Sequence, residues 1–345
     1  MINQHSHRKD EHVSLAEYFN RSNHQDYFKG IRFVHQSLPE LDYNQTDPTT
    51  KIGTLKLKWP FYIEAMTGGS PQTGKLNTRL SRIARKTHLA MATGSQSVAL
   101  SDPKLTSTFT TVRQHDPHGI VFANLGASHP VNDVKQAIQM LRANAIEIHV
   151  NAPQELIMPE GARNFKWLRN LKSIVQGVKI PVIIKEVGFG MSKEAIDKLV
   201  HIGTRYINIS GRGGTNFAKI ENFRRSRKEL NYLSNWGQTT PESLLEARPF
   251  EPHITTIASG GIKTPLDIAK ALALGASAVG VAGKILHSLL RKGDQATIQM
   301  IQDWQRGLKI IMTMLGCRNM DQLQHAPLIL SHHLFNYARQ RHLKS

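Results

Sequence analysis

The sequence has a single cysteine, Cys317, among its 345 residues. One cysteine cannot form an intrachain disulfide or a cysteine-based metal cluster, so disulfide scaffolds and zinc fingers are excluded and the fold needs no oxidising compartment. Long hydrophobic runs are also missing. The longest uncharged apolar stretch, residues 271–283, is too short to span a bilayer, and the polar residues 1–9 have no signal-peptide core. We therefore expect a cytoplasmic protein that does not enter a membrane.

Acidic residues are scarce, with 26 Asp and Glu against 44 Lys and Arg, which gives a formal net charge of +18. This excess predicts an anionic partner, which could be nucleic acid, a membrane surface or a phosphorylated small molecule. The basic run at residues 224–228 resembles a nucleic-acid patch. It has little aromatic interleaving, and such runs are usually exposed helix faces. Charge alone does not choose among these partners.

Short runs of Val, Ile and small apolar residues recur along the chain, each followed by a polar or glycine-rich turn and a helical pattern. At 40% hydrophobic and 20% charged residues, the chain can also bury a sizeable core. The mean spacing of the runs is about 31 residues, which is the size of a βα unit. The eight predicted strands are residues 61–65, 89–93, 120–124, 145–149, 181–186, 206–210, 254–259 and 278–282.

Eight such units predict an α/β fold of the (β/α)8 barrel type, with a doubly wound sheet as the alternative. We expect residues 1–345 to form one domain. Residues 1–50 have little periodicity and are predicted to be an N-terminal extension that orders late or on binding and contributes to the substrate site. Residues 211–253 are predicted to be a long inserted loop, partly mobile over 220–248, that serves as a lid. Helices are predicted again from about residue 283 to the C-terminus.

In a barrel of this type the active site lies at the carboxyl ends of the strands. The last two predicted strands end in Gly260-Gly261 and Ala282-Gly283. Glycines let backbone amides approach a phosphate closely, and the following helix N-termini favour its negative charge. This pair of turns therefore predicts a phosphate clamp, although ordinary βα turn glycines would look the same.

Two other strand ends carry side chains suited to chemistry. Lys185 would point its ammonium into the barrel mouth, where it could stabilise an anionic flavin ring or form a salt bridge with Glu155 or Glu186. Glu155 is an oxygen ligand suited to Mg²⁺, or else a solvated surface glutamate. The polar cluster His149, Asn151 and Gln154 favours substrate contact over a purely structural histidine.

The strings that carry these features closely resemble those of the type 2 isopentenyl diphosphate isomerases, which are FMN-dependent (β/α)8 enzymes unrelated to the zinc-containing type 1 isomerases. They follow the family order from residue 8 to about residue 284. The shared strings are residues 8–12 (RKDEH), 65–69 (AMTGG), 94–96 (GSQ), 124–126 (NLG), 154–155 (QE), 158–161 (MPEG), 185–188 (KEVG), 210–215 (SGRGGT) and 259–261 (SGG).

The resemblance implies roles for individual residues. FMN contacts are implied for Ala65, Met66, Thr67, Ser95, Asn124, Lys185, Ser210 and Thr215, with the FMN phosphate near Gly260, Gly261, Ala282 and Gly283. Substrate contacts are implied for Arg8, Lys9, His12, Ser95, His149, Asn151 and Gln154, and a Mg²⁺ ligand for Glu155. Arg8 and Lys9 would by themselves be interpreted as a solvated tail. Asn208 and Phe217 depart from the family pattern, in which Asp and Trp are common.

The implied reaction moves a double bond between isopentenyl diphosphate and dimethylallyl diphosphate, in isoprenoid biosynthesis. It needs one proton added and another removed without net electron transfer. The candidate residues offer no evident strong acid and base for a hydrocarbon chain. The hypothesis is therefore that reduced FMN is the acid and base, with Lys185, Gln154 and His149 as the catalytic side chains, Mg²⁺ on the diphosphate and NADPH as the reductant. The partner is then a small diphosphate rather than nucleic acid or a membrane, and the resemblance implies a homo-oligomer, a tetramer or octamer.

Three rival functions remain open. A flavin-dependent 2-hydroxy acid dehydrogenase would place a histidine in the string after the sixth strand, and residues 210–214 contain none. A nucleic-acid-binding protein would use the net charge and would show steep salt dependence. A barrel that binds flavin without activity is disfavoured by the Gln154-Glu155 pair.

Overall fold

A closed barrel of eight parallel strands forms the body of the molecule. The computed structural model describes residues 4–20 and 25–343. Around the barrel the strands are ordered β10-β11-β4-β5-β6-β7-β8-β9, so the predicted (β/α)8 barrel is confirmed and the doubly wound alternative is wrong. The strands are β4 (Phe61–Ile63), β5 (Met91–Ala92), β6 (Val121–Gly126), β7 (Ala145–His149), β8 (Val182–Lys185), β9 (Tyr206–Asn208), β10 (Thr255–Ser259) and β11 (Ala278–Val281), one within or overlapping each predicted run.

The strand sequences are nearly continuous apolar runs because both faces of each strand are covered. All four residues of β8 are buried, and this strand pairs in parallel with β7 through Ile146 opposite Val182 and Ile148 opposite Ile184. One face of each strand packs inside the barrel and the other packs under the surrounding helices. The apolar runs therefore fix both strand position and register.

The helices around the barrel begin with strong local signals. Helices α2, α10 and α11 each start with a capping box, at Ser70, Thr239 and Thr264 respectively, followed by a proline in the first turn. The helices that follow the strands are α2 (Pro71–Thr87), α4 (Ser107–His115), α5 (Val131–Leu141), α7 (Leu168–Gly177), α8 (Lys193–His201), α10 (Thr240–Ala247), α11 (Pro265–Ala273) and α12 (Gly283–Met314). The last is broken at Gly293, whose φ of 82° is not helical.

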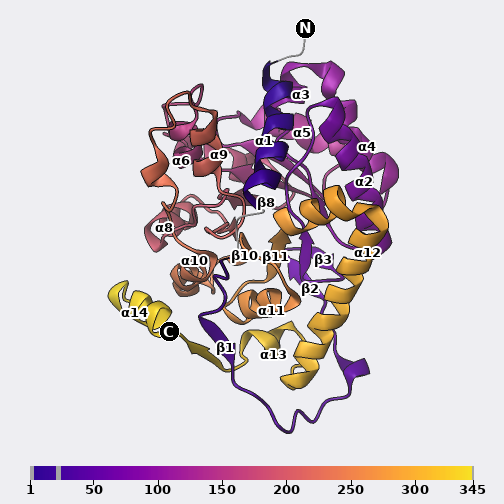
Figure 1. Cartoon of the computed structure of the whole chain (residues 1–345), viewed down its shortest axis with the longest axis vertical. Coiled ribbons are helices and arrows are strands. Elements are labelled where there is room, and N and C mark those ends of the chain that lie inside the picture. The colour runs from indigo at the N-terminus through magenta and orange to yellow at the C-terminus, as the bar shows by residue number, and fades with distance from the viewer. Residues whose placement is uncertain (1–3, 21–24, 344–345) are drawn as a thin grey trace.

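Further elements lie outside the repeated units. Strand β1 (Ile31–Phe33) pairs with β12 (Leu328–Leu330), and β2 (Thr50–Ile52) pairs with β3 (Leu55–Leu57), both antiparallel. Figure 1 shows β1 beside the C-terminal elements, so the segment that follows the N-terminal helix meets the C-terminal part of the chain on one side of the barrel. The short helices are α3 (Ser97–Ser101), α6 (Ala152–Ile157), α13 (Met320–Gln324) and α14 (His332–Gln340).

The N-terminal extension contains a helix that the sequence did not predict. Helix α1 (Gln4–Asn20) lies across the barrel mouth in Figure 1. Helices α6 and α9 (Phe217–Arg224) are on one side of it, and α2 and α4 are on the other. Residues 1–3 and 21–24 of the predicted extension lie outside the described residues. The segment between β9 and β10 contains α9 (Phe217–Arg224), which packs on α6, and then α10, which is buried. A lid role for residues 211–253 stays a prediction.

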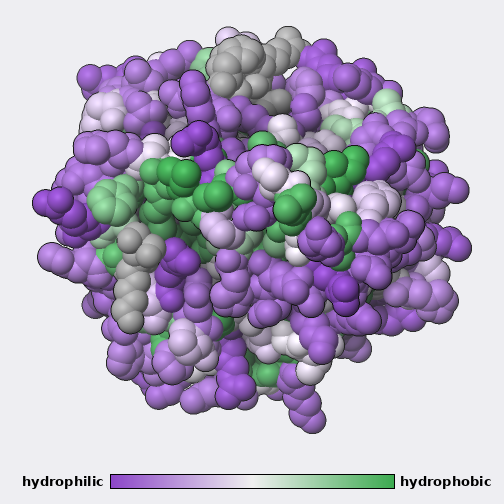
Figure 2. Space-filling view, turned by 90° about the horizontal axis from the view of Figure 1, so that it is seen from below, coloured by the Kyte–Doolittle hydropathy of each residue, from purple (hydrophilic) through white to green (hydrophobic). Residues whose placement is uncertain are grey.

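The surface is largely hydrophilic, as the composition requires. Figure 2 shows one face on which apolar side chains gather in the middle and hydrophilic side chains surround them. Among residues 4–20 and 25–343, no helix is both long enough and apolar enough to cross a bilayer.

Candidate active site

The carboxyl ends of the strands open into one cavity of about 1170 Å³. Because parallel strands of a barrel end at the same rim, residues far apart in sequence meet here. The walls contain all the predicted site residues except Thr67, namely Arg8, Lys9, His12, Ala65, Met66, Ser95, Asn124, His149, Asn151, Gln154, Glu155, Lys185, Ser210, Thr215, Gly260, Gly261, Ala282 and Gly283.

Thr67 differs from the rest of the predicted flavin contacts. Its side chain is buried, and its hydroxyl donates to Asn77 Oδ1 of α2 at 2.6 Å. The hydroxyl is therefore hydrogen-bonded to α2 in this structure.

Glycines form a tight cradle at one end of the cavity. Gly260 and Gly261 have φ values of 95° and 77°, and a Cβ on Gly260 would lie 2.0 Å from the carbonyl oxygen of Gly211. Larger residues therefore cannot take their place. Beside this cradle, Arg212 Nε is buried and has no hydrogen-bond partner among the described residues, while its guanidinium lies 5.5 Å from the ring centroid of Tyr27. Close backbone approach and a guanidinium N–H without an acceptor in the described part of the chain suit a phosphate group.

Lys185 ends β8 with its side chain buried at the cavity wall. Its Nζ donates to the carbonyl oxygen of Glu186 at 3.2 Å and lies 3.7 Å from Glu64 Oε1. The two salt-bridge partners considered from sequence, the carboxylates of Glu155 and Glu186, are not the ones found. The Glu186 carboxylate accepts hydrogen bonds from the backbone N–H groups of residues 187–189 and so orders the loop after β8.

His149 is held neutral at the end of β7. Its Nδ1 lies 2.9 Å from Asn124 Oδ1. Burial lowers the pKa of the imidazole to about 3, and the charges of Lys9 and Lys185 act in the same direction. The ring therefore contributes hydrogen bonds to the site rather than a positive charge.

Asn151, Gln154 and Glu155 lie together at the start of α6. Asn151 Nδ2 donates to Glu155 Oε1 at 2.9 Å, and the N–H of Ala162 donates to Glu155 Oε2 at 2.7 Å. Within the described residues, no three His, Cys, Asp or Glu side chains are grouped to hold a metal ion. The donor set therefore fits Mg²⁺ only in the mode in which one carboxylate is joined by substrate phosphate oxygens and water.

Helix α1 presents the predicted diphosphate-binding residues on the face that lines the cavity. Arg8 Nη1 lies 3.6 Å from Glu160 Oε1, Lys9 Nζ donates to the carbonyl oxygen of Ser95 at 3.4 Å, and His12 Nε2 lies 3.0 Å from Glu221 Oε1. Burial, and next the charge of Arg8, lowers the pKa of the Lys9 ammonium to about 8. Three side chains able to carry positive charge thus face one cavity from one helix.

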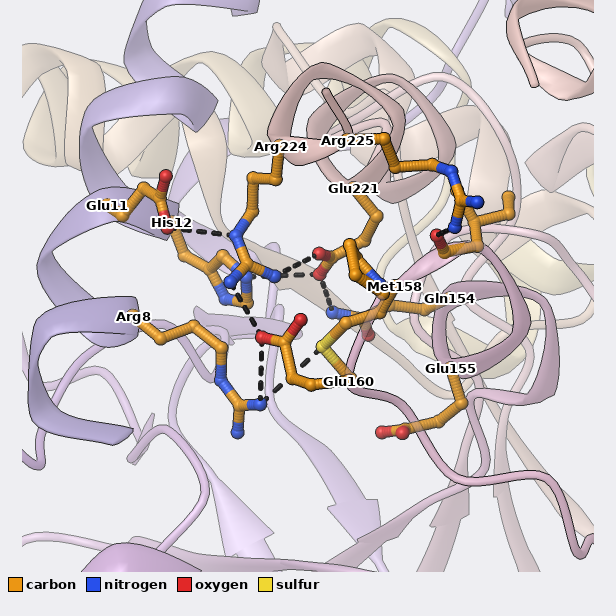
Figure 3. Close-up of polar contacts among 12 residues, drawn as sticks. Arg8, Glu11, His12, Gln154, Glu155, Met158, Glu160, Glu221, Arg224 and Arg225 are labelled. Atoms are coloured by element: carbon orange, nitrogen blue, oxygen red, sulfur yellow. Dashed lines mark hydrogen bonds and ion pairs between the residues drawn. The ribbon is translucent and has the colours of Figure 1, made fainter. Parts of the chain in front are cut away.

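Sequence reasoning missed the ion-pair cluster that holds this helix (Figure 3). Arg224 donates to Glu11 at 2.8 Å, to Glu160 at 2.6 Å and to Glu221 at 2.7 Å, and its side chain is only 13% exposed. Glu221 Oε1 also accepts from Gln154 Nε2 at 2.9 Å. The suggestion that residues 224–228 form an exposed nucleic-acid patch is therefore wrong for Arg224, which is occupied by three carboxylates.

The charges within this cluster stabilise each other. Burial alone would raise the pKa of Glu221, but the close contact with His12 and the hydrogen bonds from Gln154 and Arg224 outweigh it and leave the pKa below its ordinary value. Burial likewise opposes the charge of Arg224, yet its carboxylate partners raise the pKa of its guanidinium. Arg224 and Glu221 are thus both ionised, and together they link α9 to α1 and α6.

The two departures from the family pattern are both accommodated. Phe217 lines the cavity and meets the His12 ring edge-on, with ring centroids 6.0 Å apart. Asn208 is fully buried, and its amide donates to Glu64 Oε2 at 2.8 Å. Each residue has a defined packing partner.

The comparisons with known proteins first define the class. Residues 110–330 match the family model described as FMN-dependent dehydrogenase. Among solved structures, a flavocytochrome b2 with pyruvate bound is similar, with a TM-score of 0.69 and 19% identity over 94% of this chain and 84% of that one. A mandelate oxidase gives a TM-score of 0.63 and 16% identity over 93% and 92%. The chain is thus an α/β barrel of the FMN-dependent dehydrogenase class.

The more similar relatives narrow this class. The isopentenyl-diphosphate delta-isomerase of Latilactobacillus sakei subsp. sakei (strain 23K) is 52% identical over 98% of this chain and 97% of its own length. That of Limosilactobacillus reuteri subsp. reuteri (strain JCM 1112) is 48% identical over the full length of both chains. The chain belongs to the isopentenyl-diphosphate delta-isomerase family, in its FMN-dependent branch.

Proposed function

We propose that the protein interconverts isopentenyl diphosphate and dimethylallyl diphosphate with bound FMN. One observation carries this proposal: the glycine cradle and the cationic face of α1 line the same cavity, with Lys185 also in its wall. The cavity therefore offers two anion sites and one buried ammonium. This arrangement suits a flavin phosphate, a substrate diphosphate and an electron-rich ring in a single site.

Reduced FMN, when bound, would supply the group that gives and takes the proton at carbon, and NADPH would keep it reduced. The neutral His149 and the hydrogen-bonded Gln154 would orient the substrate without competing for its proton. Lys185 would hold its ammonium at the ring. The apolar wall residues would keep water away from the hydrocarbon chain.

The diphosphate would be held by Arg8, Lys9 and His12, with Ser95 and Asn151 beside them. Mg²⁺ on Glu155 would neutralise part of its charge. The support is the cationic face of α1 together with the lone carboxylate of Glu155 at the cavity wall. Arg8 would exchange its long contact with Glu160 for the substrate, because a diphosphate offers closer oxygens.

The test is conversion of isopentenyl diphosphate by FMN-free protein before and after FMN is added, with NADPH and Mg²⁺ present and oxygen absent. We expect dimethylallyl diphosphate only after FMN is added. Product formed at the same rate without FMN would refute the flavin role. Absence of product from a protein that has bound FMN would refute the isomerase.

Mg²⁺ binding has a separate test in Glu155→Gln. The amide keeps the size of the side chain but removes the charge that a hard cation needs. We expect the rate at saturating Mg²⁺ to fall and the Mg²⁺ concentration for half-maximal rate to rise at least about tenfold, which corresponds to about 1.4 kcal/mol. A variant with an unchanged rate and Mg²⁺ dependence would remove Glu155 from the metal site.

A further inference from the structure

Two glutamates share one tyrosine hydroxyl inside the barrel, below the cavity. Glu64 follows β4 and Glu147 lies within β7, and both are almost completely buried. The hydroxyl oxygen of Tyr62 lies 3.0 Å from Glu64 Oε2 and 3.0 Å from Glu147 Oε1. Gly280 of β11 makes room for this cluster, because a Cβ there would lie 2.2 Å from Glu64 Oε2.

The number of hydrogens available at the Tyr62 oxygen shows that the two carboxyl groups differ in protonation state. The Tyr62 hydroxyl has one proton and donates it to one carboxyl group. It also accepts from Asn208 Nδ2 at 3.2 Å. If both 3.0 Å contacts are hydrogen bonds, the second carboxyl group must bring a proton of its own.

The surrounding donors decide which group is ionised. Glu64 Oε1 accepts from the N–H of Ala65 at 2.8 Å and lies 3.7 Å from the Lys185 ammonium. Its Oε2 accepts from Asn208 Nδ2, and the orientation of that amide is fixed because Asn208 Oδ1 accepts from the N–H of Ser210. Among residues 4–20 and 25–343, Glu147 has one such donor besides the hydroxyl, Asn124 Nδ2, which lies 3.2 Å from its Oε2. The negative charge is therefore better stabilised on Glu64.

We propose that Glu147 is a neutral carboxylic acid that donates to Tyr62, that Tyr62 donates to an ionised Glu64, and that Glu64 thereby positions the Lys185 ammonium. Glu64 and Tyr62 are then positioning residues. The cluster carries one negative and one positive charge, so it is neutral as a unit. The effect of this cluster on the flavin rests on the proposed function, but the protonation state of Glu147 does not.

The charged and titratable groups around Glu147 agree with this assignment. Burial raises its pKa well above the ordinary value, and the charge of Glu64 raises it further, whereas Lys185 opposes the shift. Burial also raises the pKa of Tyr62, and the charge of the Glu64 carboxylate acts in the same direction, so the hydroxyl keeps its proton. His149 contacts Asn124, which donates to Glu147, and is itself neutral.

The test compares two isosteric substitutions, Glu147→Gln and Glu64→Gln. A glutamine at residue 147 can donate to Tyr62 and accept from Asn124 as the neutral acid does. We therefore expect Glu147→Gln to keep the thermal midpoint of the FMN-free protein and to change the dissociation constant of FMN by less than about 3-fold. Glu64→Gln leaves Lys185 without its anion, so we expect a lower midpoint, a more positive flavin reduction potential and an FMN dissociation constant changed by about 10-fold or more.

Infrared spectroscopy of the FMN-free protein in D2O provides a direct measurement. Burial raises the pKa of the Glu186 carboxyl group to about 7, so the spectra are recorded at a pH well above that value, where Glu186 is ionised. The carbonyl stretch of a protonated carboxyl group should then be present in the unchanged protein and absent from Glu147→Gln. The double variant Glu64→Gln with Lys185→Met removes both charges, so it should melt above Glu64→Gln alone and serves as the folded reference if that single variant does not fold. Equal loss of stability in both single variants, or a carboxyl band that persists in Glu147→Gln, would overturn the assignment. If the infrared result holds but the potential and FMN affinity are unchanged in Glu64→Gln, the protonation stands and the link to the flavin fails.

Discussion

At the scale of single residues, Lys9 has a charge that changes near neutral pH. Its pKa of about 8 means that the free protein presents an ammonium to the substrate below this pH and a neutral amine above it. If the diphosphate binds the ammonium, as proposed, kcat/KM should fall as the pH rises through about 8. The arginine of the Lys9→Arg variant keeps its charge at higher pH, so the fall in kcat/KM of this variant should occur at a higher pH. The measurement is kcat/KM against pH for both proteins, and identical profiles would show that Lys9 does not control binding.

Arg212 gives a second prediction at this scale. Its buried Nε has no hydrogen-bond partner in the described part of the chain, and it lies in the loop that packs on the glycine cradle. If it serves the flavin phosphate, Arg212→Met should weaken FMN binding by about 10-fold or more, as expected for loss of a charge-assisted bond. Riboflavin has no phosphate and is the matched control ligand, whose affinity should be nearly unchanged.

The opposite outcome for Arg212 is equally informative. Unchanged FMN affinity with a raised KM for isopentenyl diphosphate would assign Arg212 to the substrate instead. An equal loss for FMN and riboflavin would indicate disturbed packing against Tyr27 rather than an anion contact.

At the scale of elements, α1 depends on distant partners. Glu11 is bound by Arg224, 213 positions away, and His12 by Glu221. Arg224→Gln removes the group that joins three carboxylates, one of them fully buried. We expect KM for the diphosphate substrate to rise about 10-fold or more, equivalent to about 1.4 kcal/mol, while FMN affinity stays the same. Steady-state kinetics and FMN titration of the variant measure both.

Arg225→Gln is the matched control for this prediction. Arg225 is the neighbouring residue, but it contacts Glu229 and the carbonyl oxygen of Ile157 rather than α1. The Arg225→Gln variant should have an almost unchanged KM, since partly exposed ion pairs contribute little to stability. If the two variants have the same KM, the cluster around Arg224 does not hold α1 in place for binding.

The same helix shows where sequence reasoning stops. The apolar side chains of α1 do not gather on one face, so the pattern that reveals helices in the barrel is missing. Its position comes from ion pairs and cavity contacts between distant residues, which no local spacing encodes. Helices such as α11, with a capping box at Thr264 and a buried apolar face, were predictable for the opposite reason.

At the scale of the whole molecule, eight apolar runs at one spacing sufficed to predict the barrel. Closure then brought together the strand-end residues, which is why these parts of the cavity wall could be predicted from the spacing of the strands, whereas Arg8, Lys9 and His12 of α1 were implied only by the family resemblance. The contacts between side chains inside the barrel could not be predicted from the sequence. Glu64 and Glu147 each follow apolar residues in a strand, and only the register of β4, β7 and β8 shows that they meet Tyr62 and Lys185.

The assembly state of the molecule stays a prediction. Tyr232 and Trp236 are 77% and 61% exposed, but single exposed hydrophobic side chains are normal on a monomer, and Trp236 lies in the cavity wall. The sedimentation velocity of the FMN-bound protein measures the number of subunits.

The ratio of dimethylallyl diphosphate formed to NADPH consumed, measured without oxygen, separates an isomerase from the oxidoreductases that share this fold. A double-bond shift needs FMN to be reduced once and then used for many turnovers. We therefore predict many molecules of product for each NADPH oxidised, with the reverse reaction reaching the same equilibrium. Product formed in a one-to-one ratio with NADPH, or NADPH oxidised without any isomerised product, would contradict the proposed function.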